Sequence, residues 1–206
     1  MANIFDREIK YWISRRGIPT GLQKHMRPAD NALDLGTGGG RLAGALEECR
    51  RVAAIDRSQE LLHRAELEYP NIKFFPGDIL DSGAWDLAGP PFDLVVSNCA
   101  VRRDHTPDLE LLAELCRAKT SPGSRIVLRL QARDDLREIL PGTVRELFFS
   151  RKELERAFPG ARIQEEAYRQ RFSPGHFRRF LERIDIKWNS DFQGTATRRN
   201  LILVRD

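Results

Sequence analysis

Three aspartates, Asp34, Asp56 and Asp78, stand at or just beyond the ends of apolar runs of strand length. An ionised carboxylate accepts hydrogen bonds, so it can bind amino and hydroxyl groups, and its two oxygens can bind both hydroxyls of a ribose. Ligands of doubly wound sheets bind at the carboxyl ends of the strands. We therefore expect the three carboxylates to converge on one ligand.

The glycine-rich turn after Asp34 predicts a ligand-binding loop. Gly36, Gly38 and Gly40 lack Cβ atoms, so the backbone there can turn sharply and approach a ligand closely. A dinucleotide fingerprint needs a third glycine at the position of Arg41, so that interpretation fails. The remaining pattern, an acid followed by three alternating glycines, resembles motif I of the class I S-adenosylmethionine (SAM)-dependent methyltransferases.

The later strands extend this resemblance. Residues 52–56, 72–75 and 92–98 predict the second, third and fourth strands, in the order found in that family. The resemblance implies SAM as the cofactor and places the chain near the enzymes that methylate aconitate, malonyl carriers or secondary metabolites. An ordinary Rossmann-like domain, with acids that only cap helices, is the alternative.

The resemblance also implies roles for individual residues. Asp34 is expected near the methionine amino group or within its loop, Asp56 on the ribose hydroxyls, and Asp78 on the adenine. The other expected cofactor-binding residues are Gly36, Thr37, Gly38, Arg57, Ile79 and Asn98, the last near the transferred methyl group.

Candidate catalytic residues lie after the fourth strand and near the beginning of the chain. His105 can act as a base because its ordinary pKa is near neutrality, or it is a surface histidine beside Asp104. Arg102 can bind a carboxylate or phosphate of the acceptor, or it belongs to a solvated basic turn. Tyr11 is expected to stack on an aromatic acceptor.

Alternating strands and helices predict an α/β fold with a parallel sheet. The resemblance implies a Rossmann-like, doubly wound, seven-stranded mixed sheet whose last strand is antiparallel. The sequence pattern predicts helices at 4–16, 41–50, 59–68, 109–118 (entered at Pro107), 151–158 and 174–183, and later strands at 125–130, 162–171 and 200–204.

The chain is expected to form one domain over residues 1–206. The resemblance implies that residues 1–28 form a helical lid over the cofactor; the alternative is a helix packed on the sheet edge. Residues 29–131 predict the SAM-binding core, and 132–206 a substrate-side half with an inserted helix.

The amino-acid composition limits the expected location and binding partners of the protein. Hydrophobic residues make up 41% and charged residues 31% of the chain, as in globular proteins, and no apolar run has the length of a membrane span. Three cysteines predict neither a disulfide framework nor a metal site, so we expect a cytoplasmic protein. A small-molecule substrate is expected, without a nucleic-acid or membrane partner, and with the protein as a monomer or homodimer.

Missing motifs narrow the predicted function. Residues 97–100 read Ser-Asn-Cys-Ala, not the Asn-Pro-Pro-Tyr-type run of enzymes that methylate bases or glutamine. The sequence therefore predicts in-line methyl transfer to an O or N atom of a small, anionic or aromatic metabolite. Arginines between 169 and 183 leave an RNA methyltransferase open, and a non-catalytic SAM-binding partner protein is the alternative of another class.

Overall fold

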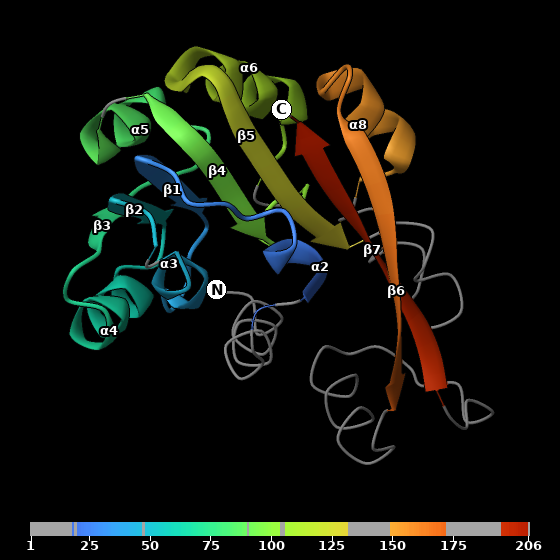
Figure 1. Ribbon diagram of the computed structural model, residues 1–206, viewed down its shortest axis with the longest axis horizontal. Coiled ribbons are helices and arrows are strands. Elements are labelled where there is room, and N and C mark those ends of the chain that lie inside the picture. The colour runs from blue at the N-terminus through green and yellow to red at the C-terminus, as the bar shows by residue number, and fades with distance from the viewer. Residues whose placement is uncertain are drawn as a thin grey trace.

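The computed structural model describes residues 18, 20–46, 48–89, 91–103, 106–131, 149–171 and 195–205. A sheet runs through this part of the chain, with helices on both of its faces (Figure 1). Tyr11, His105 and the helices predicted at 4–16 and 174–183 lie outside the described residues.

The sheet has seven strands in the order β3-β2-β1-β4-β5-β7-β6. Strands β1 to β5 pair in parallel, and β7 pairs antiparallel with both β5 and β6, which confirms the predicted mixed sheet with an antiparallel last strand. The strands are β1 (Asn31–Leu35), β2 (Arg51–Asp56), β3 (Lys73–Pro76), β4 (Phe92–Asn98), β5 (Thr120–Gln131), β6 (Arg162–Arg171) and β7 (Thr195–Arg205).

The helices divide between the two faces of the sheet (Figure 1). One hydrophobic cluster joins the sheet to α5, α6 and α8, and a second joins it to α2, α3 and α4. The helices are α2 (Thr20–Gln23), α3 (Arg41–Gly44), α4 (Gln59–Glu68), α5 (Ser82–Ala88), α6 (Leu109–Lys119) and α8 (Arg151–Ala157).

Side-chain alternation determines which polar groups share a face. Successive residues of a strand point to opposite faces. Ala32 and Val96 belong to the cluster under α3 and α4. Asp34, two residues after Ala32, and Asn98, two residues after Val96, therefore lie on that same face at the carboxyl ends of β1 and β4.

The first crossover helix is shorter than predicted. The prediction of a helix over 41–50 is wrong, because α3 ends at Gly44. The Ala45 amide donates to both Arg41 O and Leu42 O, which tightens the last turn. Glycine at 44 also weakens the helix. Its missing Cβ makes room for the Tyr69 ring, because a Cβ at this position would lie only 2.3 Å from Tyr69 Cε1.

Two other boundaries differ from the prediction. Asp108 caps α6 by accepting from the Leu111 amide, so Pro107 precedes the cap and does not lie in the first helical turn. Strand β5 begins at Thr120, ahead of the strand predicted at 125–130. Thr120 pairs with Phe92, and the register shifts before Arg125 pairs with Leu94.

The sequence pattern did not predict α5, whose buried Trp85 packs edge-on against Phe92 with ring centroids 6.3 Å apart. The helix predicted at 151–158 is confirmed as α8, and it begins with a capping box: Ser150 accepts from the Glu153 amide, and the Glu153 carboxylate accepts from the Ser150 amide.

Candidate functional site

The glycine loop lies between the ends of β1, β2 and β4. The amides of Gly36 and Thr37 both donate to Ile55 O, at 2.8 and 3.1 Å, which holds the loop against β2. Gly36 has a φ of +68°, and a Cβ there would lie 2.2 Å from the Ala100 Cβ. The loop therefore approaches the segment after β4 more closely than any side chain would allow.

Asp34 is buried beneath this loop, with 1% of its surface exposed. Among the described residues, neither its carboxylate oxygens nor the buried Thr37 hydroxyl has a hydrogen-bond partner of good geometry. Burial raises the pKa of Asp34 to about 7; Thr37 and the Ala43 amide offset part of the rise, and the charge of Asp56 adds to it. A buried acid of this kind favours a cationic donor such as an ammonium group.

Asp56 fastens the loop to the beginning of α4. Its Oδ2 accepts from the Gly38 amide and its Oδ1 from the Ser58 amide, each at 2.8 Å, while 7% of the residue is exposed. A carboxylate has about four acceptor positions, so each oxygen can still accept a further donor. The geometry is compatible with binding two hydroxyls.

Asp78 lies in the loop after β3. Its Oδ1 accepts from the Leu80 amide at 2.9 Å, and its Oδ2 lies 3.3 Å from Nη1 of Arg57, which follows β2. The Ile79 side chain is buried in the core, and its carbonyl accepts from the Trp85 indole at 2.9 Å. These contacts fix the loop that carries Asp78.

Asn98, the last residue of β4, contacts a buried arginine that the sequence analysis did not include. Nη1 of Arg129 donates to Asn98 Oδ1 at 3.0 Å and to Cys99 Sγ at 3.3 Å, and 8% of Arg129 is exposed. Asn98 and Arg129 are partners in the β4–β5 register. The available signal was a single charged residue inside the apolar run Ile126–Leu130, where a buried charge needs a specific partner.

Arg102, the candidate anion-binding residue, is buried with 5% exposed. The next residue, Arg103, faces α8. Its guanidinium pairs with Glu153 and lies 4.7 Å from the centroid of the Phe149 ring. Burial alone would raise the pKa of Glu153, but hydrogen bonds from Ser150 and Arg103 and the Arg103 charge hold it at about 2.

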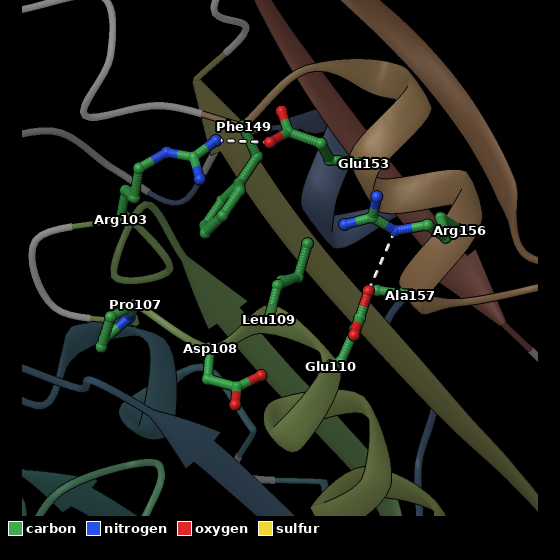
Figure 2. Close-up of a pocket in the computed structure, with 9 residues that line it drawn as sticks. All are labelled: Arg103, Pro107, Asp108, Leu109, Glu110, Phe149, Glu153, Arg156 and Ala157. Atoms are coloured by element: carbon green, nitrogen blue, oxygen red, sulfur yellow. Dashed lines mark hydrogen bonds and ion pairs between the residues drawn. The ribbon is translucent and has the colours of Figure 1, made fainter.

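A pocket of about 160 Å³ lies between α6 and α8. Figure 2 shows Arg103 facing Glu153 and Arg156 facing Glu110 across it, over the side chains of Leu109 and Phe149. Four of its charged side chains thus form two ion pairs, and the carboxylate of Asp108 accepts from the Leu111 amide, in contrast to the carboxylate of Asp34.

The described residues contain no group of three or more histidine, cysteine or acidic side chains placed to hold a metal. None of the described helices is long and apolar enough to span a membrane.

Comparison with known proteins finds a matching domain family for the part of the chain that holds most of these residues. Residues 32–123 match the family model described as a methyltransferase domain. No curated protein matches the sequence.

Solved structures show the same fold at low identity. The chain is similar to YcgJ from Bacillus subtilis (TM-score 0.64, 15% identity, 89% of this chain and 94% of that chain). It is similar to TehB from Haemophilus influenzae, with a TM-score of 0.64 and 14% identity. The match covers 97% of this chain but only 66% of the length of TehB. It is also similar to the N-methyltransferase NodS from Bradyrhizobium japonicum, with a TM-score of 0.55, 16% identity and 97% of each chain covered.

Proposed function

We propose that the part of the chain that matches a methyltransferase domain, residues 32–123, binds SAM and transfers its methyl group to an oxygen or nitrogen atom of a small metabolite. The acceptor is anionic or aromatic. SAM supplies a methyl group already activated by its positive sulfur, so the protein has mainly to bind and align two reactants. Alignment of this kind can contribute roughly 7–11 kcal/mol to lowering a barrier.

The buried carboxylate of Asp34 carries this proposal. It lies beneath the glycine loop without a hydrogen-bond partner of good geometry among the described residues, and the hydroxyl of Thr37 also lacks one. The ammonium group of the methionine part of SAM would supply both the charge and the donors that these oxygens lack. Asp34 and Thr37 would therefore hold the amino-acid end of the cofactor.

The neighbouring strand ends would hold the rest of the cofactor. Asp56 has acceptor positions left for the two ribose hydroxyls, while Gly36 and Gly38 let the loop approach the cofactor. Asp78, oriented by its contact with Arg57, would hold the adenine together with Ile79.

Asn98 would lie beside the transferring methyl group, on the same sheet face as Asp34. On the acceptor side we keep three candidates: His105 as a base, Arg102 as an anion-binding group and Tyr11 as a stacking surface. A base is needed only where the attacking atom carries a tightly held proton.

Calorimetry with SAM and with its product S-adenosylhomocysteine (SAH) tests the cofactor site. Asp56→Ala should weaken binding of both at least tenfold, whereas Asp30→Ala is a matched control, because exposed Asp30 precedes the amino end of β1. Equal affinities for wild type and Asp56→Ala would remove Asp56 from the site.

Transfer of label from methyl-labelled SAM to a metabolite extract tests catalysis. Label recovered in a small molecule supports the proposal. Tight SAM binding without any transfer would instead indicate a non-catalytic SAM-binding protein.

A further inference from the structure

The contact between Arg129 and Asn98 fixes which end of the Asn98 amide faces the ligand site. Nη1 of Arg129 lies 3.0 Å from Oδ1 of Asn98. A guanidinium has only donors, so the atom that faces it must be the carbonyl oxygen. The NH2 group of Asn98 is then held on the other side of the amide.

This NH2 group lies at the edge where the proposed cofactor site is built. Asn98 is the last residue of β4 and is half-buried, so part of its side chain is open. Two residues later, Ala100 lies against Gly36 of the glycine loop. Within the described part of the chain, no acceptor is found for the Asn98 NH2 group, and its two donors remain for a ligand.

The environment of Arg129 strengthens these donors. Arg129 is 8% exposed, so water screens its charge less than that of a surface arginine. A cation that donates to the carbonyl oxygen polarises the amide and makes its N–H groups better donors. Such a group favours a negatively charged oxygen over a neutral acceptor and offers nothing to a protonated amine, which has only donors.

We propose that the methyl acceptor is a carboxylate, that the Asn98 NH2 group donates to one of its oxygens, and that Arg129 is the positioning residue that sets the Asn98 amide. This inference rests on the function proposed above. In the reaction, the carboxylate oxygen forms a bond to the methyl carbon and the carbon–sulfur bond breaks with its electron pair remaining on sulfur.

Charge and protons balance without further groups. The anionic carboxylate and the cationic sulfonium give a neutral methyl ester and a neutral thioether. No proton leaves the acceptor oxygen, so the reaction needs no base at the position considered for His105.

Binding of two small probes to the SAH-loaded protein tests the inference without turnover. Side-chain amide signals are followed by ¹⁵N NMR, and the Asn98 signal is identified as the pair missing from Asn98→Asp. At constant ionic strength, acetate should shift the Asn98 NH2 signal saturably, whereas methylammonium should leave it unchanged. A shift by methylammonium and not by acetate, or a shift by neither probe, would overturn the inference.

Asn98→Asp is also the matched variant. Its carboxylate has nearly the same shape and can still accept from Arg129, but it offers an acceptor where Asn98 offers a donor. In melting experiments on the SAH-loaded proteins, acetate compared with chloride should raise the Tm of the wild type and not that of Asn98→Asp. An equal rise in both would contradict a role for the NH2 group.

Arg129→Gln tests the positioning role separately, because glutamine can present either end of its amide to Asn98. We expect it to weaken the acetate shift while the Asn98 signal is still observed; an unchanged shift would remove Arg129 from the argument. SAH calorimetry on the same samples distinguishes the two proposals: loss of SAH binding in the wild type refutes the proposed function, whereas SAH binding without an acetate response refutes only the inference.

Discussion

The guanidinium of Arg57, directly after β2, lies 3.3 Å from the carboxylate of Asp78, after β3. Two neighbouring strand ends are therefore joined by one ion pair. The ion pair orients the Asp78 carboxylate, for which we propose a contact with adenine.

Replacing Arg57 by leucine should affect binding more than folding. The two side chains are 49% and 37% exposed, and such pairs contribute less than about 1 kcal/mol to stability. We expect urea unfolding to change by less than that amount, while calorimetry shows weaker SAM binding. A loss of several kcal/mol in stability, with affinity unchanged, would contradict this prediction.

Cofactor affinity should depend on pH through Asp34. Its pKa is raised from 3.8 to about 7, so below pH 7 the ligand-free protein holds a proton there. An ammonium group beside the carboxylate favours the ionised form, so binding releases this proton and affinity rises as pH increases toward about 7. Calorimetry in buffers of different ionisation enthalpy measures the proton released.

Asp34→Asn supplies the control for that experiment. It should bind SAM more weakly and lose both the proton release and the pH dependence near 7. An affinity that stays constant between pH 5.5 and 8 in the wild type would place the ammonium group elsewhere.

Alanine substitutions at two neighbouring glycines should have different effects. At Gly36, φ is +68° and a Cβ would overlap the Ala100 Cβ at 2.2 Å, whereas at Gly39 nothing lies within 4 Å. We expect Gly36→Ala to lower the free energy of unfolding by about 1–3 kcal/mol and to weaken SAM binding. Gly39→Ala should change neither, and equal effects at both positions would argue against a tight contact at Gly36.

Acid stability should depend on Glu153. Its pKa is lowered from 4.5 to about 2, so the folded state binds this proton less readily than the unfolded chain. Its contribution to stability is therefore present above about pH 4.5 and is lost as the pH falls toward about 2.

Chemical unfolding at several pH values measures this contribution. Glu153→Gln should flatten the pH dependence between 5 and 2. Glu155→Gln on the same helix is the matched control, because its partner Arg151 and Glu155 itself are about half exposed. An identical pH dependence in wild type and Glu153→Gln would contradict the prediction.

The core strands and α8 could be predicted from the sequence because their signals are local. Apolar runs bounded by turn residues define β1 to β4, and Ser150 followed three residues later by Glu153 is a local pattern typical of the beginning of a helix such as α8. The end of α3 was less predictable, since it depends on Tyr69 packing against Gly44 from another element.

The same distinction applies to the candidate site. Asp34, Asp56 and Asp78 could be named because each follows a strand signal in the sequence. The contact of Arg129 with Asn98 joins residues from separate strands, and the burial of Asp34 without a partner arises only when the glycine loop closes over it. Both facts depend on tertiary packing, which spacing along the chain does not encode.

The Glu153 carboxylate also connects the beginning of α8 to the segment that follows β4. One oxygen accepts from the Ser150 amide at the beginning of α8, and the other pairs with Arg103 in the segment after β4. Pulling Arg103 away would leave a partly buried anion with fewer donors, which is costly. The loop that follows β4 and the first turn of α8 should therefore shift together, so a bulky acceptor that displaces one would carry the other with it.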